Sequence, residues 1–188
     1  MNSMKCLFFA SVVFVILTSC SSGGARTPGD GLTVVLFRHG EKPKKGDNLN
    51  CQGLNRSRAL PGVLYARFGL PEAIYVPTLG MGDNTLHSRM FQTVIPFAAK
   101  YNLQVTTKFG EDDSGDMAKE VMQRKGMVLI VWEHKRIPDI ARALGIRDTD
   151  LHWPDEDYDS LWIITFQHGT AHLERSAEGL NPAEACPF

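Results

Sequence analysis

The stretch "TVVLFRHGEKP", Thr33–Pro43, decides the fold, because it joins an apolar run directly to two cationic side chains. Residues 33–37 are apolar and rich in β-branched side chains, which is typical of a strand covered on both faces in a parallel sheet. Such a strand has no structural need of a cation at its end. Arg38 and His39 are therefore expected at the carboxyl edge of the sheet, where open α/β folds bind their ligands.

Helical and extended patterns alternate along the rest of the chain. Helices are expected over about 49–70, with an irregular middle at Pro61, over 86–101 and over 134–145. Another helix is expected between Ser114 as N-cap and Gly126 as C-cap. Strands are expected at 73–77 and 127–132, with an edge strand at 104–109 and an antiparallel hairpin around Gly169 within 160–177. This order predicts an α/β fold with a mostly parallel central sheet flanked by helices.

Length and charge bound the class of protein. The 188 residues suffice for one ordinary domain, and the formal net charge is −1. No basic stripe is present that could release the counterions of a nucleic acid. We expect a single domain over residues 32–188 that does not bind nucleic acid.

The first residues have the pattern of an export signal. Lys5 precedes the uncharged stretch Leu7–Leu17, which is too short for a membrane span but suits the core of a signal peptide. The following "LTSC", ending at Cys20, resembles the lipobox of bacterial lipoproteins. We expect residues 1–19 to be a signal peptide, Cys20 to be lipidated, and residues 20–31 to be a flexible tether. The protein would then be exported and lipid-anchored to a bacterial membrane, facing the periplasm; the alternative is an ordinary secretory signal.

Two cysteines then remain, Cys51 and Cys186. In an oxidising compartment they could form a disulfide, and two unpaired buried thiols are the alternative. No CxxC or HExxH spacing indicates a zinc site, so no metal is expected. The acidic segments 112–116 and 155–159 fit no EF-hand loop and are expected to be solvated loops.

Candidate functional residues follow three of the expected strands. Arg38 and His39 come after the first strand, Arg89 lies near the start of the helix after the second, and His134 follows the strand at 127–132. Strand ends at one sheet edge converge in space. Two arginines beside two histidines favour phosphate, because each guanidinium offers a planar fork of donors to its oxygens. His87, which matches no such pattern, is expected to be a surface or loop residue.

Four segments together resemble the histidine phosphatase superfamily, also called phosphoglycerate mutase-like. They are "FRHGE" at 37–41, "LNCQGLNRSRAL" at 49–60, "SRMFQT" at 88–93 and "VLIVWEH" at 128–134. Their order and spacing agree with that family over roughly residues 32–166.

The resemblance implies a phosphoglycerate mutase-like fold and a metal-independent phosphatase without a cofactor. His39 would attack phosphorus and form a phosphohistidine, while Arg38, Arg89 and His134 would neutralise the phosphoryl oxygens. The substrate would be a phosphomonoester or phosphohistidine, carried by a small molecule, an envelope component or a phosphoprotein. The alternative is a catalytically silent envelope lipoprotein that binds a phosphorylated or anionic ligand in the same pocket.

The proton donor for the leaving oxygen stays open among three residues. In the mutase-like branch a glutamate on a loop after the second arginine helix serves, which implies Glu111. In the acid phosphatase branch an aspartate follows the second histidine, but Lys135 stands there in this chain and Glu133 precedes the histidine instead. Glu41 is the third candidate.

Overall fold

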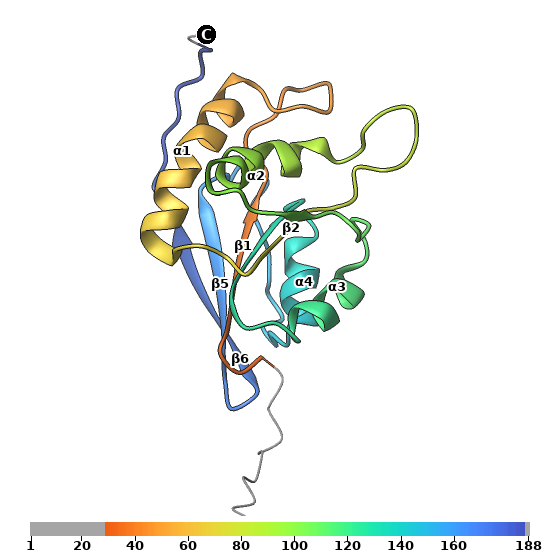
Figure 1. The fold of residues 1–188 in the computed structure, drawn as a ribbon, viewed down its shortest axis with the longest axis vertical. Helices are drawn as coiled ribbons and strands as arrows, with labels where there is room; N and C mark the ends of the chain where they lie inside the picture. The colour runs from red at the N-terminus through yellow and green to blue at the C-terminus, as the bar shows by residue number, and fades with distance from the viewer. Residues whose placement is uncertain (1–28, 187–188) are drawn as a thin grey trace, which may run out of the picture.

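A computed structural model describes residues 29–186 (Figure 1). The elements in chain order are β1 (Leu32–Arg38), α1 (Cys51–Phe68), β2 (Ala73–Tyr75), α2 (Ser88–Tyr101), β3 (Val105–Thr106), α3 (Ser114–Val121), β4 (Gly126–Trp132), α4 (Ile137–Ala143), β5 (Ser160–Gln167) and β6 (Thr170–Ala177). Residues 1–28, which include the expected signal peptide, Cys20 and most of the expected tether, lie outside the described part. Within the described part, no helix combines the length and the apolar character that crossing a membrane requires.

The six strands form one sheet in the order β3-β2-β4-β1-β5-β6. The pairs β3–β2, β2–β4 and β4–β1 are parallel, whereas β5 pairs antiparallel with both β1 and β6. The predicted α/β class, with a mostly parallel sheet and a C-terminal antiparallel hairpin, is confirmed.

Two pairs of helices cover the two faces of this sheet. Side chains alternate along a strand, so Val35 and Phe37 of β1 pack in one core with α1 and α2, while Val34 and Leu36 pack in the other with α3 and α4. All four are completely buried. The apolar run of β1 is thus explained by its position near the middle of the sheet, between β4 and β5.

Helix α1 differs from expectation at its middle. It runs through Pro61 as one α-helix, although proline removes a backbone donor from the helical ladder. Leu60 and Leu64 are fully buried in the core beneath α2, and this packing offsets the lost bond. The irregular middle predicted from Pro61 was therefore wrong.

The limits of α3 also differ from expectation. Asp113, not Ser114, precedes the helix, and its carboxylate accepts from the Gly110 amide instead of capping the helix. The helix ends at Val121, and Gly126 begins β4 with φ +67°. The positive φ that favours glycine here belongs to the turn into the strand, not to the helix end.

The C-terminal segment lies beside α1 and is tied to it (Figure 1). Cys186 forms a disulfide with Cys51, the first residue of the helix, with 5.1 Å between their Cα atoms. The Asn55 side-chain amide also donates to the carbonyl oxygens of Ala183 and Ala185. The bond joins the last described residue to a helix that starts just after the loop of His39.

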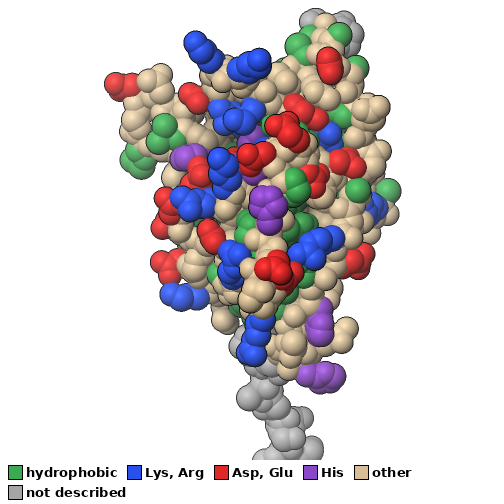
Figure 2. All heavy atoms as spheres, turned by 180° about the vertical axis from the view of Figure 1, so that it is seen from behind, with side chains coloured by type: hydrophobic (Ala, Val, Ile, Leu, Met, Phe, Trp, Pro, Cys, Tyr) green, Lys and Arg blue, Asp and Glu red, His purple; other side chains and the backbone are tan. Residues whose placement is uncertain are grey.

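Charged side chains of both signs are mixed on the surface of the folded part. Figure 2 shows one face of the molecule, on which basic and acidic side chains lie next to one another and neither sign forms a continuous stripe. This distribution agrees with the formal net charge of −1. On this face, therefore, no extended basic surface of the kind that follows a nucleic acid backbone is present.

Candidate active site

Parallel pairing of β1 and β4 brings the two expected histidines together. Arg38 lies opposite Trp132 in the register, so His39 and Glu133 leave the sheet side by side. Glu133 then lies between the histidines: its Oε2 is 3.0 Å from His39 Nε2, and its Oε1 is 2.7 Å from His134 Nδ1. The two oxygens of one carboxylate thus each lie close to one ring nitrogen, the first to that of His39 and the second to that of His134.

His39 is completely buried, and the ring nitrogen that does not face Glu133 holds the ring in place. Its Nδ1 lies 2.7 Å from the Gly40 carbonyl oxygen. A carbonyl oxygen only accepts, so Nδ1 carries a proton and the lone pair of a neutral ring resides on Nε2. That nitrogen points toward Glu133 and is the one available for attack on a ligand.

Two glycines allow the loop after β1 to lie against α1. A Cβ on Gly53 would come 2.3 Å from the Glu41 carbonyl oxygen, and one on Gly40 would come 3.0 Å from the Gly53 backbone. The Gly40 amide donates to Thr93 Oγ1, which in turn donates to the Arg89 carbonyl oxygen. These contacts fix the His39 loop relative to α2, the helix that carries Arg89.

Arg38 is 1% exposed and held by groups far away in the sequence. Its Nη1 donates to the carbonyl oxygens of Asp155 and Asp157 at 2.5 and 3.3 Å, and its guanidinium stacks 3.8 Å from the centre of the Tyr158 ring. Burial lowers the pKa of Arg38, although the surrounding anionic groups oppose this. Its Nε and Nη2 have no hydrogen-bond partner among residues 29–186, so both remain available to an anion.

The segment 155–159 is a loop with exposed acidic side chains, as expected, and it also contributes to the site. Besides holding Arg38, it places Asp155 Oδ1 2.9 Å from His134 Nε2. The pKa of Asp155 is lowered, mainly by the hydrogen bond from His134 and to a lesser degree by the charge of Lys135. Asp155 thus orients His134 so that its other nitrogen faces Glu133.

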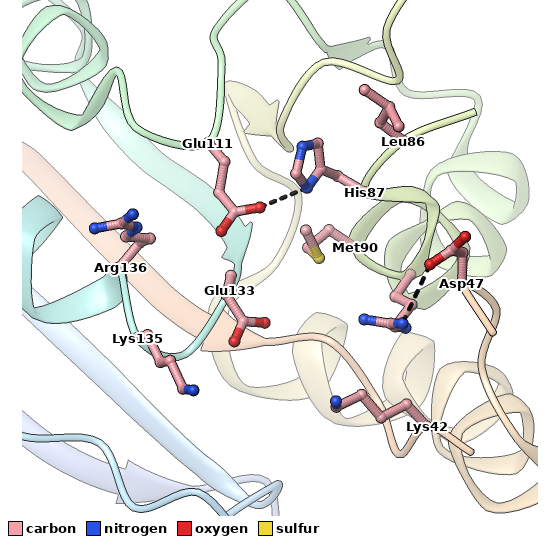
Figure 3. A pocket seen from close by; sticks show the side chains of 10 residues that line it. Lys42, Asp47, Leu86, His87, Met90, Glu111, Glu133, Lys135 and Arg136 are labelled. Carbon is pink, nitrogen blue, oxygen red and sulfur yellow. Dashed lines mark ion pairs between the residues drawn. The ribbon is translucent and has the colours of Figure 1, made fainter. Parts of the chain in front are cut away.

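Arg89 lines a cavity of about 540 Å³ that is also lined by Glu133, the carboxylate between the two histidines. Figure 3 shows this cavity from close by. Its lining residues are Lys42, Asp47, Leu86, His87, Arg89, Met90, Glu111, Glu133, Lys135 and Arg136. Arg89 donates to the Gly46 carbonyl oxygen and lies 3.6 Å from Asp47, while its Nε is buried without a partner in the described part of the chain. His87, which the sequence placed on a surface or loop, lines this cavity.

The three candidate proton donors lie in different surroundings. Glu111 and Glu133 both line the cavity, where Glu111 lies 2.5 Å from His87 Nδ1 (Figure 3). The Trp132 indole donates to the Glu111 backbone carbonyl and so fixes its loop. Glu41 instead accepts two bonds from the buried Arg56 and faces a separate hollow.

The electrostatics keep Glu133 ionised. Burial alone would raise the pKa of its carboxyl, but hydrogen bonds and charge from His134 and His39 outweigh this and hold it well below the ordinary value. His39, Glu133 and His134 also offer ligand atoms within 4.8 Å of one another, which is compatible with a metal ion. The unpartnered nitrogens of Arg38 and Arg89 favour an anion instead.

Known structures share this fold. The chain is similar to the protein histidine phosphatase SixA complexed with tungstate, with a TM-score of 0.57 and 15% identity over 78% of this chain and 97% of that one. It is also similar to SixA from Agrobacterium tumefaciens (TM-score 0.56, 14% identity, 78% and 98% covered) and to a mutant phosphoserine phosphatase from Entamoeba histolytica in complex with phosphoserine (TM-score 0.53, 10% identity, 79% and 97% covered). No protein-family model matches the sequence, and no curated protein sequence does either.

Proposed function

We propose that this protein is a phosphatase of the histidine phosphatase type, which hydrolyses a phosphomonoester or a phosphohistidine through a covalent intermediate on His39. The observation that carries the proposal is the pair of inward-facing ring nitrogens, His39 Nε2 and His134 Nδ1, on either side of one carboxylate. A phosphoryl group placed there would meet a nucleophile on one side and a donor on the other. The folds of two proteins named as phosphatases agree with this reading.

The reaction takes two steps. In the first, His39 Nε2 forms a bond to phosphorus while the bond from phosphorus to the leaving oxygen breaks and that oxygen takes up a proton. In the second, water attacks the phosphohistidine, so that the P–N bond breaks and inorganic phosphate leaves. The unpartnered nitrogens of Arg38 and Arg89 neutralise the equatorial oxygens as charge shifts in each transition state.

The proton in the first step is assigned to Glu111. Glu133 is ionised because the two histidines hold its pKa low, so in the free protein it has no proton to donate. Once His39 Nε2 is bonded to phosphorus, its contact with Glu133 is lost, and the carboxylate can then accept a proton from water in the second step. Glu41 is engaged by Arg56. Glu111→Gln should slow turnover of alkyl phosphates far more than that of 4-nitrophenyl phosphate, whose leaving group is stable without a proton. Equal slowing of both substrates contradicts this assignment.

The central test is His39→Ala. This variant should lose turnover and keep its fold, because it removes the attacking nitrogen from a site that is built mainly by backbone and by other side chains. Rapid quenching of the wild-type protein at alkaline pH should trap an acid-labile phosphoryl group on His39, which mass spectrometry of peptides locates. Full activity in His39→Ala would overturn the mechanism.

A specific observation also supports the second candidate, a catalytically silent protein that binds a phosphorylated ligand. Glu133 contacts the very nitrogen that would attack, so the nucleophile is engaged in the free protein. A wild-type protein that binds inorganic phosphate but turns over no member of a broad panel of phosphate esters would favour this candidate.

We also propose that the protein is exported and anchored through lipid on Cys20, facing the periplasm. The disulfide between Cys51 and Cys186 supports an oxidising compartment. Cells fed a labelled fatty acid should incorporate label into the wild-type protein and not into Cys20→Ala. Absence of label from the wild type would contradict the anchor.

A further inference from the structure

Two lysines on the rim of the main cavity stand apart from the other charged residues that line it. Asp47 pairs with Arg89, His87 with Glu111, Arg136 with Asp112, and Glu133 with both histidines. The side-chain amines of Lys42 and Lys135 form no hydrogen bond or ion pair with any residue between 29 and 186. Lys135 acts on Asp155 only through its charge, without a direct contact, so both amino groups can bind a ligand in the cavity.

The positions of the two lysines follow from the sheet. Lys42 lies on the loop that leaves β1 and Lys135 on the turn that leaves β4, so these neighbouring strands carry them to the same edge. Figure 3 shows their amino groups pointing toward one another across the cavity, with Glu133 between them. His39 is fully buried, so the remainder of a ligand whose phosphoryl group meets Nε2 must extend outward past Glu133. It then passes the two lysines.

We propose that Lys42 and Lys135 bind a second anionic group of the substrate, and that the site therefore selects small organic phosphates that also carry a carboxylate or a further phosphate. This inference rests on the proposed function, because it takes the phosphoryl group to lie between His39 and His134. An ammonium group is a compact charge on a flexible stem, so the pair recognises negative charge and not one planar shape. A cavity of about 540 Å³ has room for more than a phosphoryl group.

The net charge of the rim supports the same class of ligand. A neutral leaving group would remain beside two unneutralised ammonium groups, with Arg89 and Arg136 on the same cavity. A second anionic group on the ligand neutralises the two ammonium groups, which then exchange contacts with water for charge-assisted contacts with the ligand. Both lysines are exposed, so we expect a moderate preference that weakens as salt concentration rises.

The test compares substrates that differ only by the second anion. One pair is glycerol 3-phosphate with 3-phosphoglycerate, and a longer pair is glucitol 6-phosphate with 6-phosphogluconate; in each, the second compound has a carboxylate where the first has a hydroxymethyl group. The readout is the ratio of kcat/KM within each pair at low salt. For the wild type we expect a ratio of about ten or more in at least one pair, and for the double variant Lys42→Ala, Lys135→Ala a ratio near one.

A matched control separates this effect from a general loss of positive charge. Lys44 and Lys45 are exposed on the same loop and do not line the cavity, so the double variant Lys44→Ala, Lys45→Ala removes the same charge and should keep the wild-type ratio. Lys42→Arg with Lys135→Arg should retain most of the preference. Wild-type ratios near one in both pairs, or equal loss in the two double alanine variants, would overturn the inference.

The inference can fail independently of the proposed function. Binding of the same four compounds by calorimetry is measured alongside turnover. If neither these compounds nor phosphohistidine nor any member of the broad panel is hydrolysed, the phosphatase proposal fails. Tighter wild-type binding of the carboxylated partners, lost in Lys42→Ala, Lys135→Ala, then still supports the lysine site. If all four are hydrolysed and bound alike, the lysine site is refuted and the phosphatase proposal stands.

Discussion

Replacing Glu133 by glutamine should make the site bind inorganic phosphate more tightly. The carboxylate contacts the inward nitrogens of His39 and His134 at 3.0 and 2.7 Å. A phosphate that takes these nitrogens must displace it. Glutamine keeps the shape of the side chain but loses its charge, and with it the charge-assisted part of both contacts.

The size of the effect follows from those two contacts. A hydrogen bond that involves a charged group contributes about 1.5–3 kcal/mol. If displacing the neutral glutamine costs less free energy than displacing the carboxylate by roughly that amount in total, phosphate affinity should rise about 10- to 150-fold. Turnover should fall at the same time, because the proposed base for the attacking water is lost; general base catalysis contributes roughly 10²–10⁴-fold.

The assay is calorimetric titration of wild type and Glu133→Gln with inorganic phosphate at about pH 6. The pKa of Glu133 is held below its usual range, so the wild-type carboxylate is still charged at this pH. Glu111→Gln is the control, since it makes the same replacement on the same cavity at a side chain that pairs with His87 and not with His39 or His134. Unchanged or weaker phosphate binding in Glu133→Gln would refute the reasoning.

Three further predictions concern the disulfide, the buried glutamate beside Arg56, and the second arginine. Replacing Cys51 and Cys186 by alanine should lower the free energy of unfolding by up to about 5 kcal/mol, since the disulfide closes a loop with a sequence separation of 135. Denaturant unfolding of the wild type with and without reductant measures the same effect. An unchanged free energy of unfolding on reduction would contradict the prediction. Burial, aided by the charges of Asp159 and Glu41 and opposed by Arg56, raises the pKa of Glu178 to about 8. As pH rises, the unfolded chain therefore loses this proton before the folded protein does, so stability should fall from about pH 4.5 to about pH 8. Glu178→Gln should remove this part of the dependence of the melting temperature on pH. The same dependence in wild type and variant would count against the prediction. Arg89→Ala should keep its fold and some measurable activity, with kcat/KM lowered roughly 30- to 1,000-fold, because one charge-assisted contact in a transition state contributes about 2–4 kcal/mol. Complete retention of activity would exclude a role of Arg89 in stabilising the transition state.

Residues near the strand ends could be predicted from the sequence because local pattern determines their place. The apolar runs of β1 and β4 locate His39 and His134, and the parallel register of those strands brings both to Glu133. Arg89 was predicted from its place near the start of the helix after the second strand, and the structure places it on the cavity that Glu133 also lines.

The partners of those residues could not be predicted, because long-range packing creates them. Arg38 is separated by 117 residues from Asp155, whose carbonyl oxygen it binds, and its stacking on Tyr158 has no local signal. The acidic segment 155–159 is a solvated loop, as its composition predicts, but composition does not indicate that its backbone carbonyls accept from a buried guanidinium. The irregular helix predicted at Pro61 was wrong for a related reason. The packing of its neighbours, and not local propensity, keeps α1 continuous.

The direction of β1 determines how the pocket would be presented by an anchored protein. The described chain enters β1 at Leu32, and the strand ends at Arg38, about 20 Å away at roughly 3.3 Å a residue (Figure 1). The residues of the site follow that end of the strand. Residues 20–31 at full extension would add up to about 40 Å. With lipid on Cys20, the pocket would lie at the end of β1 opposite the tether, and the reach of the tether would bring it to molecules dissolved in the surrounding compartment.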